Sequence, residues 1–279
     1  LLTDRTRLTR VTSSEFTIII PARFASTRFP GKPLVFLRGA SGTPKSLIHR
    51  SWECASWVLG CTGVWVATDD ERIAAEVESF GGKVVFTSEE CASGTERCAD
   101  AIRRLGDVPD LIVNMQGDAP LSPAWVVNQL ICRLQTDDSL AMATPAVRCS
   151  PSLYEHLKAD EAAGRVGGTT VVFSGQSRAL YFSKRLIPYL PPVYAGGGSV
   201  PIHLHLGMYA YRTGALRAYA EATSSELENL EGLEQLRFLD LGLPVSVVQI
   251  EQLDWDSIEL NNPSDVPQIE RVLADRGID

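Results

Sequence analysis

FTIIIPARFASTRFPGKPL, residues 16–34, is the stretch that decides the fold of this chain. Residues 17–20 form a β-branched run that predicts a buried strand, and Pro21 ends it. The loop that follows contains small residues and three cations, which are Arg23, Arg28 and Lys32. In an open α/β sheet, such a loop at the carboxyl end of the first strand can bind an anion. The alternative is a solvated loop that happens to be basic.

The overall charge of the chain favours the anion site. The 279 residues carry a net charge of −8, so three cations in one short loop are unusual for this acidic chain. An acidic chain is also a poor general nucleic-acid binder, and we expect no nucleic-acid partner. No apolar run approaches the roughly 20 residues that cross a bilayer, so we expect no membrane insertion and a cytoplasmic protein. The six cysteines contain no C-x-x-C pair, which predicts buried free thiols in a reducing compartment.

Strands and helices alternate over the first half of the chain. Helical periodicity at 44–59, 71–80, 93–105 and 125–134 is interleaved with β-branched runs at 63–68, 83–86 and 110–114. This rhythm predicts an α/β fold with a doubly wound, mostly parallel sheet.

The second half of the chain has a different rhythm. Two β-branched runs at 169–173 and 179–183 flank a Ser-Gly-Gln-Ser turn, which predicts a hairpin. Further strands are expected at 141–147, 205–212 and 245–250, and helices from 214, at 233–239 and at 263–274. We therefore expect one domain over 16–279 with a smaller β-rich lobe at about 150–212. Residues 1–15 are polar and are expected to form a flexible lead.

Two common nucleotide-binding motifs are absent from the loop after the first strand. Gly31-Lys32 does not belong to a Walker A loop, because Ser26 and Pro33 stand where that motif needs Gly and Ser or Thr. A G-x-G-x-x-G fingerprint is also missing, which removes the usual dehydrogenase signature.

Asp118 is the strongest candidate for a metal ligand. It follows a predicted strand in NMQGDAP, residues 114–120, and a carboxylate at this position can bind a hard cation such as Mg²⁺. The alternative is an Asx-turn that only stabilises the bend. A magnesium ion opposite three cationic side chains would suit transfer of a phosphorylated group, which needs no enzyme nucleophile.

Seven blocks of sequence together resemble one family, 3-deoxy-manno-octulosonate cytidylyltransferase, the CMP-Kdo synthetases. They follow the family's order from about residue 16 nearly to the end of the chain. The blocks are residues 20–34, V-A-T-D at 66–69, S-G-T-E-R at 93–97, V-N-M-Q-G-D-A-P at 113–120, A-L-Y-F-S at 179–183, H-L-G-M-Y-A-Y-R at 205–212 and L-E-Q-L-R at 233–237.

The resemblance implies a Rossmann-like nucleotidyltransferase fold and a sugar-activating reaction. CTP and a 2-keto-3-deoxy sugar acid would give the CMP-sugar and pyrophosphate, with Mg²⁺ as cofactor. The family is typically dimeric, so the resemblance also implies a homodimer whose interface lies in the lobe at about 150–212.

The same resemblance assigns roles to individual residues. Arg28, Lys32 and Asp118 would be catalytic, and Asp118 with Asn261 would bind the metal. Nucleotide recognition would involve Arg23, Ser93, Gly94, Thr95 and Arg97, and the sugar acid would contact Gln116, His205, Glu234 and Gln235. The residues alone leave simpler alternatives open: His205 as a strand histidine bonded to a neighbour, and residues 234–235 as an exposed helix face.

Four positions depart from the family pattern. Ala119 replaces an acidic residue, and Asn261 stands where a metal-binding Asp is expected. Thr170 and Lys184 replace a Lys and an Arg near the sugar side, which puts the identity of the sugar acid in question. The alternatives are a nucleotidyltransferase for another acid or a phosphonate, and a catalytically weak nucleotide-binding paralogue.

Overall fold

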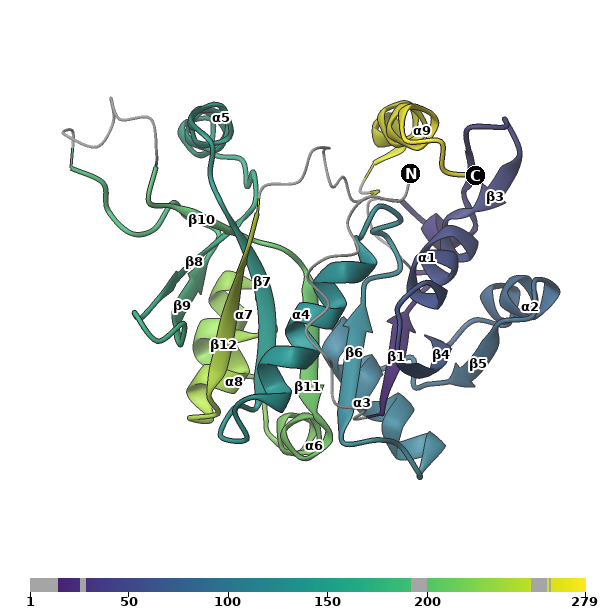
Figure 1. Ribbon diagram of the computed structural model, residues 1–279, viewed down its shortest axis with the longest axis horizontal. Helices are drawn as coiled ribbons and strands as arrows, with labels where there is room; N and C mark the ends of the chain where they lie inside the picture. Colours follow the sequence, from purple (N-terminus) through teal and green to yellow (C-terminus); the bar gives the residue numbers. More distant parts are fainter. Residues whose placement is uncertain (1–14, 26–28, 192–199, 252–259, 261) are drawn as a thin grey trace.

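A single mixed sheet forms the centre of the computed structural model, which describes residues 15–25, 29–191, 200–251, 260 and 262–279 (Figure 1). Within these residues the sheet has ten strands in the order β5-β4-β1-β6-β11-β7-β10-β8-β9, and β12 also pairs with β7. Their bounds are β1 Phe16–Pro21, β4 Cys61–Thr68, β5 Lys83–Phe86, β6 Leu111–Met115, β7 Met142–Arg148, β8 Thr169–Phe173, β9 Ala179–Ser183, β10 His203–His205, β11 Met208–Arg212 and β12 Val245–Ile250. The expected flexible lead lies outside the described residues, except for Glu15.

The first half of the sheet is parallel, as the sequence predicts. β1 lies between β4 and β6, with Ile20 opposite Val66 and Ile19 opposite Asn114, and β5 extends this half. The connecting helices are α1 (Leu47–Ser56), α2 (Glu71–Ser79), α3 (Gly94–Leu105) and α4 (Ala124–Gln135). Asp70 and Ser93 cap α2 and α3 through their side chains, because each accepts a hydrogen bond from a backbone N–H of the first turn.

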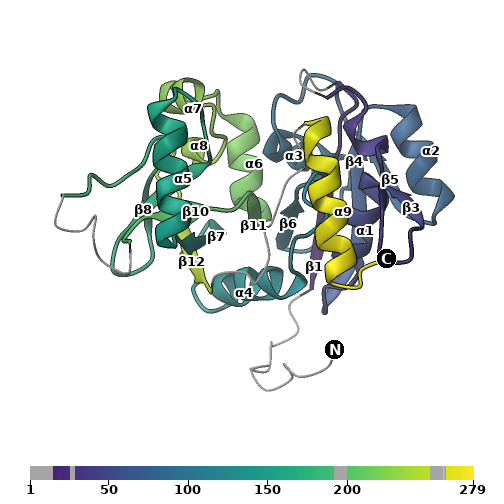
Figure 2. The ribbon, with the colours of Figure 1, turned by 90° about the horizontal axis from the view of Figure 1, so that it is seen from above.

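Helices cover both faces of the sheet, which confirms the doubly wound architecture (Figure 2). α1, α2 and α4 contribute to one hydrophobic core, which includes Ile48, Ile73 and Leu130. The opposite core combines α3 with α6 (Thr213–Glu221) and α8 (Leu236–Asp240) and includes Ile102 and Phe238. Among the residues described, no helix has the length and apolar character to cross a membrane.

The second half of the sheet is largely antiparallel. The predicted hairpin is present as β8 and β9, with Thr170 opposite Ser183, and β10 joins it to β7. The strand expected at 205–212 is divided in two: β10 pairs with β7 and β8, whereas β11 pairs with β6 and β7. The boundaries of a smaller lobe at about 150–212 remain a prediction.

Some elements differ from the sequence prediction. The helix expected from residue 44 begins at Leu47, because Pro44–Ser46 forms β3 and pairs with β2 (Phe36–Arg38). Two further helices, α5 (Pro151–Ala162) and α7 (Glu226–Glu231), were not expected. The sequence of α5 lacks an apolar stripe, because Leu157 is the one residue that this helix buries. At the end of the described chain, α9 (Val266–Asp275) packs on β2 and α1 through Ile269 and Leu273.

Gly117 fixes how closely the ends of β1 and β6 approach. A Cβ atom at this position would lie 2.9 Å from the carbonyl oxygen of Pro21 and 3.3 Å from Cγ2 of Ile20. The backbone after β6 can therefore lie against the end of β1 only because residue 117 has no side chain.

Gly117→Ala should lower the free energy of unfolding by about 1–3 kcal/mol, because the backbone carbonyl of Pro21 cannot yield as a flexible side chain would. Urea denaturation followed by circular dichroism measures the change. Gly175→Ala is the matched control, since a Cβ atom there meets nothing within 4 Å. Equal loss of stability in the two variants would contradict the assigned contact.

Candidate active site

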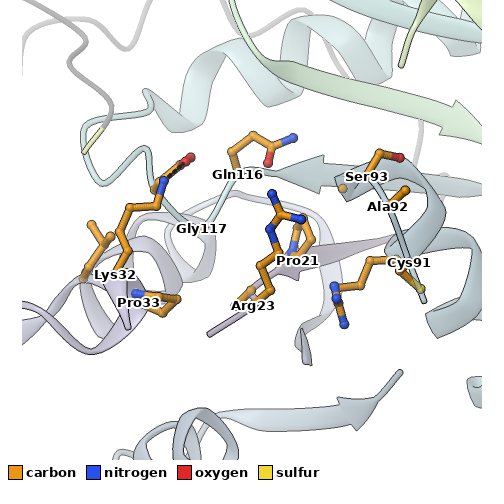
Figure 3. A pocket seen from close by; sticks show the side chains of 14 residues that line it. Pro21, Arg23, Lys32, Pro33, Cys91, Ala92, Ser93, Gln116 and Gly117 are labelled. Carbon is orange, nitrogen blue, oxygen red and sulfur yellow. Dashed lines mark hydrogen bonds and ion pairs between the residues drawn. The ribbon is translucent and has the colours of Figure 1, made fainter. Parts of the chain in front are cut away.

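A polar pocket of about 360 Å³ lies where β1 and β6 end and α3 begins (Figure 3). The short 3₁₀ helix η1 (Lys32–Leu34) contributes to its wall. Seven residues that the sequence singled out line this pocket: Arg23, Lys32, Ser93, Gly94, Arg97, Gln116 and Asp118. The parallel strands therefore bring together segments that are about 90 residues apart in the chain, as expected for the carboxyl edge of such a sheet.

Lys32 and Asp118 form an ion pair on one side of this pocket. Their Nζ and Oδ2 atoms are 2.5 Å apart, and the side chains are only 16% and 25% exposed. Lys32 is positioned by Gly31, which has a φ of 70° and donates its N–H to the carbonyl of Phe24. This left-handed turn closes the loop after β1 at its base. Arg28, the third predicted cation, lies outside the described residues.

The surroundings of Asp118 fit a metal ion that takes some of its ligands from the protein and the others from a substrate. In the described part of the chain, no cluster of three or more His, Cys, Asp or Glu side chains could hold a metal. The Asp118 carboxylate faces the pocket and already has a positive charge beside it in the Lys32 ammonium. Mg²⁺ is commonly bound by one or two carboxylates together with phosphate oxygens, so this donor set fits such an ion.

The chain just before the second predicted metal ligand contacts Asp118. The backbone N–H of Leu260 donates to the carbonyl oxygen of Asp118 at 2.9 Å, and the Leu260 side chain is fully buried. Asn261 itself lies outside the described residues.

Arg23 and Gln116 approach the middle of the pocket from opposite sides. Figure 3 shows the Arg23 guanidinium and the Gln116 amide directed into the same space. Gly94 makes room for this amide, because a Cβ atom there would lie 3.1 Å from Nε2 of Gln116. The arrangement offers one cation and one amide to a polar ligand.

Arg97 forms part of the pocket wall, but its guanidinium is bonded within the protein. It donates to Asp69 Oδ2 at 2.8 Å and to Thr87 Oγ1 at 2.6 Å, and the residue is 2% exposed. Sequence reasoning missed the pairing with Asp69, although both residues lie in quoted blocks. It also missed Cys91 and Ala92 as lining residues.

Thr95 lies behind the pocket and connects α3 to a second site. It is 1% exposed, and neither pocket includes it among its lining residues. Its N–H donates to Glu234 Oε2 at 2.9 Å, and its hydroxyl bonds the hydroxyl of Tyr211 at 2.8 Å. Burial raises the pKa of Glu234.

The second pocket, of about 470 Å³, adjoins the first. Both are lined by residues 92–94, which we call the shared wall. Glu234 and Gln235 lie here with Tyr209, close to α7, and they are not an exposed helix face. Gln235 is 1% exposed, and its Nε2 has no hydrogen-bond partner among the described residues. An unpaired buried amide at a pocket wall is a candidate donor to a ligand.

His205 is buried outside both pockets. Its Nε2 lies 2.7 Å from Thr144 Oγ1, and that hydroxyl donates to the carbonyl of Met208. His205 therefore donates from Nε2. Burial lowers its pKa to about 3. This is the environment of a strand histidine bonded to a neighbour, and the ring approaches the second pocket only through Tyr209, at a ring distance of 5.5 Å.

Comparison with known proteins gives consistent matches. The cytidylyltransferase family model matches residues 17–245. The 3-deoxy-manno-octulosonate cytidylyltransferase of Maricaulis maris is 40% identical over 259 residues, 93% of this chain and 97% of that protein. The 8-amino-3,8-dideoxy-manno-octulosonate cytidylyltransferase of Shewanella baltica is 40% identical over 260 residues, 92% of this chain and 98% of that protein.

Solved structures agree with these matches. A CMP:2-keto-3-deoxy-manno-octonic acid synthetase complexed with CTP has a TM-score of 0.80 and 31% identity, and the match covers 94% of this chain and 100% of that one. A cytidylyltransferase from Leptospira borgpetersenii has a TM-score of 0.57 at 15% identity, covers 91% of this chain and 84% of that one, and supports the fold alone. The predicted family and fold are thereby confirmed.

His205→Gln should reduce the loss of stability at acidic pH. The pKa of His205 is about 3 in the fold against an ordinary 6.5, so the unfolded chain binds the proton first as the pH falls. This group alone should cost the fold about 2–3 kcal/mol between about pH 6.5 and pH 4.5. Urea denaturation of both proteins at the two pH values measures the difference, and parallel losses would contradict a buried neutral His205.

Proposed function

Because the chain belongs to the 3-deoxy-manno-octulosonate cytidylyltransferase family, we propose that it transfers the cytidylyl group of CTP to a 2-keto-3-deoxy sugar acid. The observation that carries this proposal is the pair of adjoining pockets with a shared wall at residues 92–94. The anomeric hydroxyl oxygen of the sugar acid attacks the α-phosphorus of CTP and loses its proton to solvent. The bond between the α-phosphorus and the oxygen that bridges to the β-phosphate breaks, and pyrophosphate leaves. Two adjoining pockets suit a reaction that joins two substrates at one atom.

The first pocket suits the nucleotide. Lys32 and Arg23 place positive charge beside the position where the leaving pyrophosphate gains negative charge, and Arg28 from the same loop would add a third cation. The backbone of Lys32 has a fixed position because Gly31 forms the turn that precedes it. Transfer of phosphorus groups depends mainly on such positioning and charge stabilisation.

The second pocket suits the sugar acid. The unpaired Nε2 of Gln235 can donate to a hydroxyl or carboxylate oxygen, and Gln116 offers an amide from the adjoining pocket. We expect His205 to act on the sugar indirectly, by supporting the ring of Tyr209.

Cytidylyltransferases of this kind generally use a divalent metal, and we propose Mg²⁺ here. Asp118 would hold it together with phosphate oxygens of CTP, and Asn261, next to Leu260, would add a neutral amide oxygen. A bound Mg²⁺ neutralises phosphate charge and polarises the phosphorus centre. The Lys32 ammonium lies beside the Asp118 carboxylate, so both charges would face the metal and the phosphates.

The relatives named above leave two closely related sugar acids as acceptors, with and without an amino group at carbon 8. Two of the positions that depart from the family pattern can be located in the structure. The hydroxyl of Thr170 donates to the carbonyl of Arg185 and accepts from the N–H of Ile187. Lys184 keeps a cation close to the second pocket, since its Nζ lies 2.8 Å from where a Cβ atom on Gly232 would be. The Lys184 cation supports an acidic acceptor, whereas the Thr170 hydroxyl is bonded within the protein.

Two broader alternatives follow from the substitutions. A different acid or a phosphonate acceptor would use the same nucleotide pocket, and Asn261 favours a catalytically weak paralogue. The intact Lys32–Asp118 pair supports the enzyme instead, because a silent site has no need of paired charges. A homodimer remains a prediction from the family resemblance, and a cytoplasmic location remains a prediction from the composition of the chain.

The proposed reaction predicts pyrophosphate release with CTP and 3-deoxy-manno-octulosonate or its 8-amino analogue, in the presence of Mg²⁺. UTP and ATP should support much less release, and Lys32→Met should lower kcat/KM by about 10²-fold or more because a preorganised cation is lost. A coupled pyrophosphate assay measures these rates. Release with another acid only would change the substrate, and no release with any pair would overturn the enzyme.

Asn261→Asp should lower the Mg²⁺ concentration that gives half-maximal activity, by about tenfold. A second carboxylate near Asp118 attracts the cation more strongly than an amide oxygen does. Titrating Mg²⁺ in the same assay at saturating CTP measures the shift. An unchanged titration curve would show that residue 261 does not contact the metal.

A further inference from the structure

We propose that Arg237 is a positioning residue that holds the shared wall, through Glu96, in the form both substrates need. The proposal rests on the function given above and extends it to a residue to which the sequence assigned no role. In this role Arg237 does not contact a ligand itself, although it is one of the residues that line the second pocket. It lies on α8, 4% exposed, where α8 meets α3, α6 and α7.

All five N–H groups of the Arg237 guanidinium are used inside the protein. Nε donates to Glu228 Oε2 at 2.7 Å, and Nη2 donates to Glu228 Oε1 at 2.7 Å and to Glu96 Oε1 at 2.8 Å. Nη1 donates to the carbonyl oxygens of Tyr219 and Ala222, both at 3.3 Å. Since a guanidinium has five donors, none remains for a substrate, and any effect on the reaction must pass through these partners.

Glu96 carries the effect of Arg237 to the shared wall. Its Oε1 accepts from Arg237, and its Oε2 accepts from the backbone N–H of Ala92 at 2.8 Å. Its own backbone N–H donates to Ser93 Oγ at 3.1 Å. The Glu96 side chain therefore connects α8 to Ala92, and the Glu96 backbone bonds the neighbouring Ser93.

Charge gives Arg237 a second reason to matter. Glu96, Glu228 and Glu234 all line the second pocket, and the proposed substrate there is an acid. Arg237 is paired with the first two carboxylates at side-chain exposures of 26% and 10%. Its bidentate fork satisfies both glutamates at once, which the single ammonium of a lysine cannot reproduce.

Arg237→Lys should therefore raise KM for both CTP and the sugar acid, by about tenfold for the sugar acid, and change kcat by less than about threefold. Tenfold corresponds to the loss of roughly one charge-assisted hydrogen bond. Glu96→Gln should raise KM for both CTP and the sugar acid, because an amide cannot accept from Arg237 and Ala92 at once. The double variant should be no worse than the worse single variant, since both changes break one connection.

Arg212→Lys is the matched control. Arg212 also bonds two carboxylates and two carbonyls, of Asp110, Asp138, Leu134 and Leu140, but it lies at the end of β11 away from both pockets. It should lower Tm without changing either KM. Should Arg237→Lys behave as Arg212→Lys does, with a lower Tm and unchanged KM values, the positioning role is overturned.

A readout without substrates separates this proposal from the proposed function. Cys91 lines the first pocket next to Ala92 and is a free thiol. In the absence of ligands, its alkylation by iodoacetamide, measured by mass spectrometry, should be severalfold faster in Arg237→Lys and Glu96→Gln than in the wild type and Arg212→Lys. Equal rates in all four proteins would overturn the positioning role. Failure of the proposed function would appear instead as a wild type that releases no pyrophosphate, whatever the alkylation rates.

Discussion

The parallel pairing of β1 with β6 is the constraint on which the site depends. Because Ile18 and Ile19 lie opposite Val113 and Asn114, both strands end at the same edge, and the loops after them must meet. Gly117 allows that meeting to be close, with backbone against backbone. The Lys32–Asp118 ion pair is the chemical result, since each partner comes from one of these loops and neither strand alone would create the pocket.

The walls of the two pockets depend on buried arginines that contact no substrate in the arrangement proposed here. Arg97 joins α3 to Asp69 after β4, and Arg237 joins α3 to α7 and α8. Replacing a buried ion pair by apolar groups often leaves stability unchanged, whereas removing one partner costs about 3–5 kcal/mol. Their contribution is therefore geometric: Arg97 connects α3 to the end of β4, and Arg237 connects α3 to α7 and α8.

Local sequence patterns predicted the elements that bury a continuous apolar face. β1, β5, β12 and the β8–β9 hairpin follow from β-branched runs, and the start of α3 follows from Ser93 as its cap. α5 was missed because a helix that buries only Leu157 has no periodic signal. The partners of Arg237 and Arg97 were missed for another reason. Glu96 is 141 residues from Arg237, and only the folded sheet brings such carboxylates to their arginines.

The first turn of α3 has few free N–H groups to offer a phosphate in the proposed nucleotide site. A helix N-terminus often binds phosphate through its free N–H groups. Here the N–H of Thr95 donates to Glu234, that of Glu96 to Ser93 Oγ, and that of Arg97 to the Ser93 carbonyl. Among the residues of this first turn, only the N–H of Gly94 is left for a ligand. The Glu234 carboxylate already lies at the positive end of the helix dipole. In the proposed function, Lys32 and Arg23 would stabilise a phosphate in the first pocket instead, which agrees with a loop that has cations and no Walker A glycines.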